Sequence, residues 1–363
     1  MAIAYAIYLA MALLYKEPII FANDSCLWFL HREWISDPQF SEDGEYLAMT
    51  TTRRFADTLY RTVLVCDTRN WRPVREIVLD QYYKVRNGPR AGLLEKRYAE
   101  RAQRCGFAWV PQSRGQLLYF TPEGKLYSIL IRDNHAQPEI VWRGRAVFRL
   151  SLSPNGKYAA VVARTENWEG ISCVVLDIST RRVIKEHRTS MPGPPYPVSA
   201  FSHDGAYLAI SDGELIDVLD LRTGKLTADG LADGDDCITA LAFTPDDRVL
   251  LALDFTGELR WWDWRKGKVL GSTLIQGISH RAAIEVLCSG MDSYMVVWNS
   301  NLVTLYDLKR LKVVWSKSWS CSGCSLKPGD FVVAIGTGSD GIVFDKIMLL
   351  DMRTGEPWQH KKE

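Results

Sequence analysis

Residues 198–229 read VSAFSHDGAYLAISDGELIDVLDLRTGKLTAD and contain four short apolar segments separated by three turns. The turns are centred on HDG, DGE and LRTG. Their Asp and Gly residues supply a hydrogen-bond acceptor for backbone amides and a residue that tolerates positive φ. Apolar residues alternate with small or polar ones within the segments, as they do along a β-strand. This stretch therefore predicts four short antiparallel strands and leaves no room for a helix.

The same unit recurs along the chain. One Asp closes the third apolar segment of each unit, and the steps between these aspartates are 66, 44, 43, 43, 44 and 44 residues. They are Asp67, Asp133, Asp177, Asp220, Asp263, Asp307 and Asp351. Tandem four-stranded units of about 40–45 residues are typical of propeller blades around a central channel. We predict an all-β fold, a seven-bladed β-propeller of four-stranded antiparallel blades that forms one domain over residues 1–363.

One unit carries a family motif. Residues 259–268, LRWWDWRKGK, place the dipeptide Trp262-Asp263 at the position of the repeated aspartate. Residues 40–356 resemble WD40-type repeats in three features, which are this dipeptide, the length of the units and the pattern of turns. The other units have a different residue before the Asp, and no Gly-His pair opens a unit. The resemblance therefore implies the propeller fold and no role for any single residue.

The N-terminal residues are expected to close the ring. Residues 2–15, AIAYAIYLAMALLY, alternate large and small side chains and are too few to span a membrane, so they are interpreted as a buried strand. Two further apolar segments within residues 1–34, PIIFAND and SCLWFLHRE, have no partner next to them in sequence. Because the final unit ends soon after Asp351, we expect an N-terminal strand to complete it. Asp24 lies 43 residues before Asp67, which leaves an eighth blade as the alternative.

The overall charge of the chain does not indicate a highly charged partner. The chain has 44 Lys and Arg residues against 43 Asp and Glu residues, so its net charge does not point to nucleic acid or an anionic membrane. The eight cysteines lie mostly singly in apolar runs, which is typical of buried thiols in a reducing compartment. We expect a cytoplasmic location, with the nucleus as the alternative.

Motifs for catalysis, metals and cofactors are missing or incomplete. GTGSDG at residues 336–341 matches a dinucleotide fingerprint but precedes a strand-like segment instead of a helix. CSGC at residues 321–324 lacks a second pair of zinc ligands, and the acidic segment 229–236 lacks the spacing of a calcium loop. No nucleophile elbow, HExxH pair or Walker loop is found. We predict no catalytic residues, metal, cofactor or small-molecule substrate.

One insertion interrupts the repeat between the first two blades, at residues 80–106. Residues 89–104 lack β-branched side chains and place Leu94, Tyr98 and Ala102 four positions apart, which favours a short amphipathic helix. The insertion has seven positive side chains against three negative ones. Loops that follow a fourth strand emerge on the same face of a propeller as loops between second and third strands, such as TTTRRFADTLYRT at residues 50–62. This basic face is therefore the predicted docking surface.

The residues predicted to bind partners there are Arg53, Arg54, Arg61, Tyr82, Tyr83, Lys84, Arg86, Arg90, Lys96, Arg97, Tyr98, Arg101, Arg104 and Trp168. Residues 204–263 carry 14 acidic against four basic side chains, which predicts an acidic rim elsewhere. Charge divided in this way suits oriented docking. The sequence favours a non-catalytic scaffold for other protein subunits of a complex. RNA binding through the basic insertion and its tyrosines is the alternative, and an enzyme with its site at the channel mouth ranks last.

Overall fold

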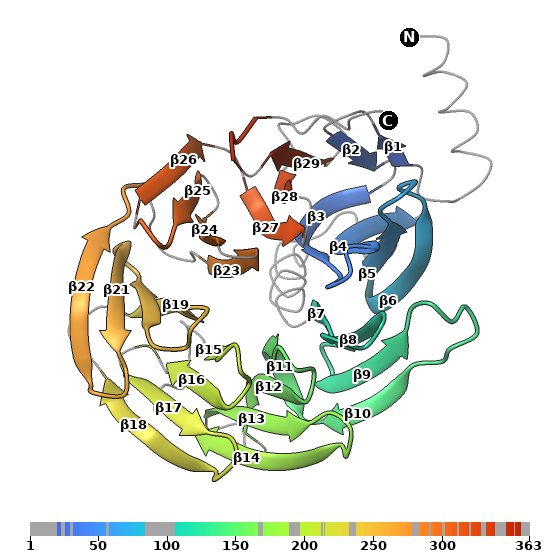
Figure 1. The fold of residues 1–363 in the computed structure, drawn as a ribbon. Helices are drawn as coiled ribbons and strands as arrows, with labels where there is room; N and C mark the ends of the chain where they lie inside the picture. Colours follow the sequence, from blue (N-terminus) through green and yellow to red (C-terminus); the bar gives the residue numbers. More distant parts are fainter. Residues whose placement is uncertain are drawn as a thin grey trace, which may run out of the picture.

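The period-two apolar segments form β-strands in the computed structural model, and the described residues contain 29 of them. The structure describes the chain except for residues 1–19, 23–25, 30–31, 56–57, 84–105, 166–169, 189–196, 212, 214, 232–236, 278–282, 290–291, 300–301, 311, 319–320, 328–331, 338–345, 352 and 357–363. The sheets stand side by side in a ring around a central axis, as Figure 1 shows. All-β propeller architecture is thereby confirmed. The segment 2–15 and the helix predicted at residues 89–104 lie outside the described residues.

Six sheets have four antiparallel strands each, in sequential order from the centre of the ring outwards. Blade 1 consists of β3 (Arg32–Phe40), β4 (Tyr46–Phe55), β5 (Thr58–Asp67) and β6 (Pro73–Tyr83). Blade 2 consists of β7 (Gly106–Trp109), β8 (Gln116–Phe120), β9 (Lys125–Leu130) and β10 (Glu139–Arg143). Blade 3 consists of β11 (Arg145–Leu152), β12 (Tyr158–Arg164), β13 (Ile171–Asp177) and β14 (Arg182–Arg188).

The next three blades repeat this arrangement. Blade 4 consists of β15 (Val198–Phe201), β16 (Tyr207–Ser211), β17 (Ile216–Asp220) and β18 (Lys225–Leu231). Blade 5 consists of β19 (Ile238–Phe243), β20 (Leu250–Asp254), β21 (Glu258–Asp263) and β22 (Lys268–Leu274). Blade 6 consists of β23 (Ala283–Ser289), β24 (Asp292–Trp298), β25 (Leu302–Asp307) and β26 (Lys312–Ser318).

The remaining sheet, which we call the closing sheet, is built from both ends of the chain. The final repeat supplies β27 (Cys321–Lys327), β28 (Val332–Thr337) and β29 (Lys346–Asp351). β2 (Cys26–Phe29) pairs antiparallel with β29, and β1 (Ile20–Ala22) pairs with β2 as a fifth, outermost strand. The described residues thus form six four-stranded blades, where the sequence predicted seven blades or eight. The seventh sheet differs because β1 and β2 both join it and make it five-stranded, while β3 begins blade 1, so the described residues before Phe40 form no eighth blade.

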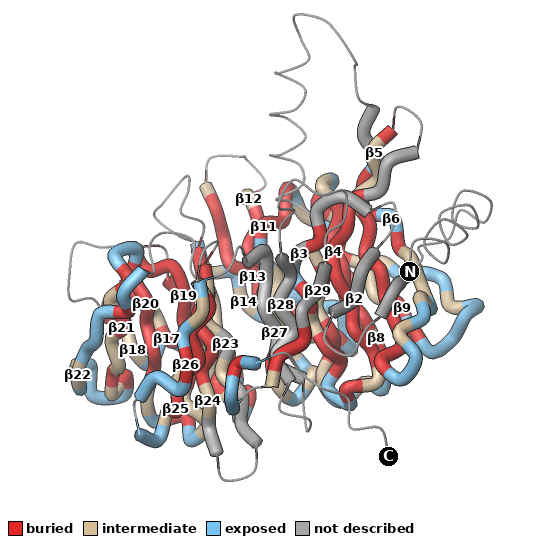
Figure 2. The backbone as a smooth tube through the Cα atoms, turned by 90° about the horizontal axis from the view of Figure 1, so that it is seen from above, coloured by how far each residue is buried: buried red, intermediate tan, exposed pale blue. Residues whose placement is uncertain are grey.

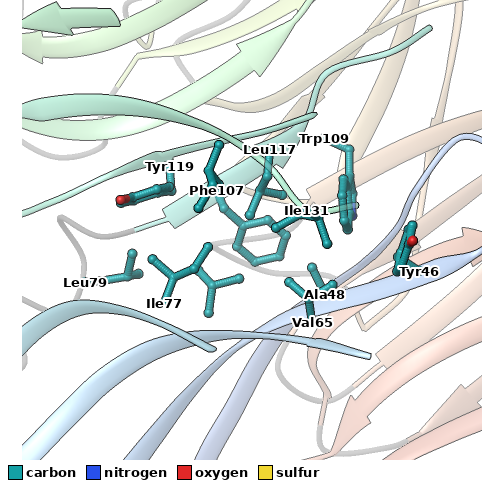
Figure 3. Close-up of a cluster of buried hydrophobic side chains, with 12 residues drawn as sticks. Tyr46, Ala48, Val65, Ile77, Leu79, Phe107, Trp109, Leu117, Tyr119 and Ile131 are labelled. Carbon is teal, nitrogen blue, oxygen red and sulfur yellow. The ribbon is translucent and has the colours of Figure 1, made fainter. Parts of the chain in front are cut away.

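Neighbouring blades pack through both faces of each sheet. In β4 the side chain of Ala48 faces blade 2, whereas Leu47 and Met49 lie in a cluster with Leu349 of the closing sheet. The interface between blades 1 and 2 is a dense apolar cluster, and the rings of Tyr46 and Trp109 stack there with centroids 5.9 Å apart (Figure 3). Every blade therefore depends on two neighbours to bury its apolar residues.

The repeated aspartates lie at the turns between third and fourth strands. The carboxylate of Asp220 accepts hydrogen bonds from the backbone N–H groups of Arg222 (2.8 Å) and Thr223 (3.0 Å), as the sequence predicted. The other repeats bind their turn amides in the same way, through Asp67, Asp133, Asp177, Asp263, Asp307 and Asp351. We call the face with these turns and the first-to-second-strand turns the turn face, and the opposite face the loop face.

Asp247 ties two blades together on the turn face. It has a φ of 56°, at the turn position where blades 1, 3 and 4 have Gly44, Gly156 and Gly205 with φ of 66–69°. The left-handed conformation costs a non-glycine residue roughly 1 kcal/mol. Its carboxylate compensates by accepting hydrogen bonds from two backbone N–H groups of blade 4, those of His203 (2.7 Å) and Asp204 (2.9 Å).

The β2–β29 pairing predicts a specific cross-link between the two ends of the chain. Cys26 lies opposite Met348, and paired residues in antiparallel strands have Cα atoms about 4.5–5.5 Å apart, within the range of a disulfide. The Met348→Cys variant should therefore form a disulfide with Cys26 under oxidising conditions and raise the free energy of unfolding by about 2–4 kcal/mol. Peptide mapping under non-reducing conditions identifies the bond, and urea unfolding with and without reductant measures its effect. A variant that cross-links other cysteines instead would contradict the closing sheet.

The turn carboxylates predict acid sensitivity. Hydrogen bonding lowers the pKa of Asp220, chiefly from the Thr223 backbone, and the pKa of Asp67, chiefly from the Arg69 side chain. Groups whose pKa is lower in the folded chain stabilise the fold above the ordinary value of 3.8, and this contribution is lost as the pH falls below that value. The melting temperature should therefore be nearly constant from about pH 7 to pH 5 and should fall between about pH 4 and pH 3.

Replacing two of these carboxyls isolates their share of the effect. In the Asp67→Asn/Asp220→Asn variant the amide side chains still accept hydrogen bonds but do not titrate, so the melting temperature should fall less steeply between about pH 5 and pH 3. Thermal unfolding followed by circular dichroism measures both curves. Parallel curves for the variant and the parent would assign the acid sensitivity to other groups.

Candidate functional site

Blade 1 carries a hairpin that is longer than its counterparts. β4 and β5 each have ten residues, whereas the second and third strands of the other four-stranded blades have five to seven. The additional residues extend beyond the ring on the loop face, where β5 rises above the neighbouring strands (Figure 2). At about 3.3 Å per residue, three extra residues project the hairpin by roughly 10 Å. We call residues 50–63 of these two strands the blade 1 hairpin.

Residues 50–62 were predicted to form a loop, and this prediction is wrong. Only residues 56–57 lie between β4 and β5, and the rest are paired in an uninterrupted register from Thr52↔Arg61 to Phe55↔Thr58. The run of threonines explains the difference, because β-branched residues favour strands. The polar stretch therefore extends the sheet instead of forming a loop.

Hydroxyl groups hold the base of the blade 1 hairpin together. The Thr51 and Thr62 Oγ1 atoms lie 2.9 Å apart across the two strands, and both residues are fully buried. Thr50 Oγ1 donates to Asp37 Oδ2 (3.1 Å) and accepts from Arg61 Nη2 (3.3 Å). The Arg61 guanidinium is thus bonded within the hairpin, and its contact with a partner stays a prediction.

The insertion begins beside the same hairpin. β6 continues through residues 80–83, so the first residues of the predicted insertion are strand. In the pairing of β5 with β6, Arg61 lies opposite Asp80 and Leu59 lies opposite Tyr82, while Thr58 lies opposite Tyr83. In the pairing of β4 with β5, Arg53 lies opposite Tyr60 and Arg54 opposite Leu59.

The structure therefore brings five of the predicted site residues to one end of three adjacent strands. These are Arg53, Arg54, Arg61, Tyr82 and Tyr83. The other nine lie outside the described residues: Lys84, Arg86, Arg90, Lys96, Arg97, Tyr98, Arg101, Arg104 and Trp168. Sequence reasoning placed the hairpin and the insertion on the same face, and the strand register agrees with that placement.

The described aspartates of residues 204–263 lie on both faces of the ring. Asp204 and Asp246 lie in first-to-second-strand turns on the turn face, where they accept the N–H groups of Ala206 (2.8 Å) and Arg248 (3.2 Å). Asp254 is buried at the loop-face end of blade 5, where its Oδ1 atom accepts the backbone N–H of Glu258 (2.9 Å). These carboxylates stabilise turns on two different faces, and the acidic rim stays a prediction because five of its acidic residues lie outside the described ones.

A pocket of about 320 Å³ lies on the turn face between blades 1 and 2. Its lining consists of Ser41, Glu42, Asp43, Trp109, Val110, Gln112, Ser113, Arg114 and Gly115. Gln112 and Arg114 have φ values of 59° and 54°, so the blade 2 turn differs from the single-glycine turns of blades 1, 3 and 4. The sequence signal was the replacement of the recurring turn pattern by PQSRG at residues 111–115, which the repeat analysis did not use.

The described residues offer no metal site or membrane-spanning helix. No three His, Cys, Asp or Glu residues in this part of the chain are placed to hold a metal ion. Within the same ranges, no helix has the length and apolar character that crossing a membrane requires. Neither observation decides what the chain binds.

Comparison with known proteins adds no relative. No protein-family model matches the chain, and no curated protein matches its sequence.

The paired hydroxyls in the blade 1 hairpin predict a non-additive effect on stability. Replacing one threonine by valine leaves the other hydroxyl buried without its partner, so Thr51→Val or Thr62→Val alone should lower the free energy of unfolding by about 1–3 kcal/mol. The double variant removes both polar groups and should cost no more than one single variant. Urea unfolding of the parent and the three variants measures the coupling. Additive losses would show that the two hydroxyls do not interact.

Proposed function

We propose that this protein is a non-catalytic, WD40-like scaffold that docks other protein subunits on its loop face. The blade 1 hairpin and the basic insertion form the main contact in this proposal. The observation that carries it is the hairpin that extends past the ring while the other four-stranded blades keep short second and third strands. Packing between blades does not need those extra residues, so a role outside the ring accounts for their presence.

The rigid base of the hairpin supports a docking role. Buried threonine hydroxyls and the Arg61 contact fix the strands that carry Arg53 and Arg54. A preformed surface binds with a smaller loss of conformational entropy than a loop that must become ordered. The seven positive residues of the insertion, which begins at the end of β6, add a field that would orient an acidic partner.

The remaining parts of the proposal concern architecture and location. We count the closing sheet as the seventh blade of a WD40-type ring, because the final repeat and an N-terminal strand together provide its four inner strands. We propose a cytoplasmic location, with the nucleus as the alternative. Cys173 supports a reducing compartment, since it is a buried free thiol whose pKa burial raises to about 12, which makes it a packing residue with little reactivity.

RNA binding is the second candidate function. Tyr82 of β6 and Arg54 of β4 both lie opposite Leu59 of the strand between them, so aromatic and cationic residues occupy one end of three adjacent strands at the base of the insertion. Stacking on aromatic rings combined with phosphate contacts is how proteins commonly bind single-stranded RNA. This candidate uses the same surface and differs from the first in its salt dependence.

Charge reversal on the hairpin tests the docking proposal. In an affinity pull-down from cell extracts, the Arg53→Glu/Arg54→Glu variant should retain at least about tenfold less of its protein partners than the parent. The reason is that the variant places negative charges against an acidic partner. Arg222→Glu is the matched control, since Arg222 is exposed on the turn face of blade 4. Thermal unfolding verifies that both variants are folded. Unchanged recovery by the hairpin variant would refute this docking surface.

A titration with labelled single-stranded RNA separates the two candidates. RNA binding through several phosphate contacts should weaken by orders of magnitude between about 50 and 200 mM salt. If the parent binds RNA with this salt dependence and the hairpin variant does not, the RNA function replaces protein docking as the role of the surface. Absence of binding at low salt removes the RNA function.

A further inference from the structure

The outer edge of blade 5 differs from the outer edges of the other blades. β22, with the sequence KVLGSTL, has a single charged residue, Lys268, at its first position. The outer strands β6, β10, β14, β18 and β26 each carry at least two charged residues. Charged residues on an edge strand discourage pairing with another chain. Among the described outer strands of the four-stranded blades, β22 therefore has the fewest charged residues to discourage such pairing.

Two large apolar side chains lie exposed along this edge. Leu270 is 50% exposed and Leu274 is 62% exposed, the highest value among the exposed large apolar residues of the described chain. The pairing of β21 with β22 shifts register between them, because Trp262 lies opposite Val269 and Trp261 lies opposite Gly271. Leu270 therefore lies at a β-bulge, and Leu274 lies at the far end of the strand. The edge therefore exposes two large apolar side chains, and no described strand pairs with the outer side of β22.

A third apolar side chain extends this surface onto the loop face. Phe255 is 47% exposed and lies in the turn between β20 and β21. The Ile275 backbone N–H, next to Leu274, donates to Gly257 O of the same turn (2.9 Å). Leu274 and Phe255 thus belong to the same corner of blade 5. We call Phe255, Leu270 and Leu274 together with β22 the blade 5 edge.

The opposite end of β22 is cationic. Arg265, Lys266 and Lys268 are exposed at the turn that precedes or begins the strand. Arg265 is held in place because its guanidinium lies 4.1 Å from the centre of the Trp264 ring and donates to Asp247 O (2.8 Å). Lys266 pairs with Asp263 at 2.8 Å. A segment lying along β22 would meet positive charge at this end and apolar side chains at the other.

We propose that the blade 5 edge binds an extended segment of a partner protein by adding it to β22 as a fifth strand. Backbone hydrogen bonds to β22 supply affinity, and apolar side chains of the segment cover Leu270 and Leu274. Acidic residues follow at the end that lies beside Lys268. In the antiparallel orientation, whose pairing is slightly more stable, this is the C-terminal end of the segment.

A second copy of this chain is a poorer occupant than an extended segment. β22 lies on the convex outside of the ring (Figure 1), so two rings would touch along about one strand each. Such a contact is smaller than the roughly 1,200 Å² that specific, stable interfaces bury. A single extended strand matches the width of the edge and meets both its charged and its apolar end.

This inference is independent of the docking surface on the blade 1 hairpin. The two surfaces belong to different blades, and the blade 5 edge is on the rim of the ring. The Arg53→Glu/Arg54→Glu variant should therefore bind a strand-forming peptide as the parent does. The failure of one proposal leaves the other standing.

The test uses the full chain and a short fluorescein-labelled peptide in which Val and Leu alternate with Thr and two Glu residues form the C-terminus. Fluorescence anisotropy measures its binding. Leu270→Lys and Leu274→Lys should each weaken binding at least about tenfold, since they remove apolar contact and add charge to the edge. Val183→Lys is the matched control, because Val183 on β14 is 51% exposed and should change binding by no more than about twofold.

The mode of binding is tested with a modified peptide. Two modified peptides are compared, each N-methylated at alternate backbone amides along one of its two edges. One of them should lose binding and the other should keep it, because a strand uses only one edge for pairing with β22. Three results would overturn the proposal. The first is that the peptide does not bind, and the second is that the parent and the Leu270→Lys variant bind it equally. The third is a dimer in sedimentation velocity that Leu270→Lys converts to a monomer, which would assign the edge to a second copy.

Discussion

Burial of both faces of each sheet by its neighbours is the constraint on which the rest of this structure depends. In β20 the side chains of Leu250 and Ala252 pack against blade 4, whereas Leu251 and Leu253 pack against blade 6. Such a sheet cannot bury its apolar surface alone, so the stability of each blade requires the two blades beside it. A ring satisfies this requirement for every sheet, but only if its first and last sheets also meet.

Closure explains the composition of the last sheet. The described part of the final repeat has three strands, and β2 from the N-terminal region pairs with β29 to cover that edge. Leu349 of β29 also lies in a cluster with Ile35 and Phe40 of blade 1. The two ends of the chain are thus held by backbone pairing and by side-chain packing at the same place, where an open ring would expose a sheet edge and an apolar face.

The same constraint limits where function can reside. Side chains between blades are occupied by packing, and the repeated aspartates are occupied by the amides of their own turns. What remains is the surface that departs from the repeat. The long blade 1 hairpin on the loop face and the weakly charged β22 on the rim are two such departures, and each carries one of the proposed binding roles. A chain built this way can present separate surfaces to separate partners without altering its core.

Sequence alone determined the features that depend on residues a few positions apart. The strand period and the Asp-capped turns are local, because a side chain reaches a turn amide two or three residues away in any context. The N-terminal segments could also be assigned to closure, since the final unit lacked a complete fourth strand. Tertiary structure decided the rest. The five-stranded closing sheet and the exposure of Leu270 and Leu274 depend on which strands meet across the ring. Those meetings join residues far apart in the chain, and their geometry follows from the packing of whole sheets, which no local pattern encodes.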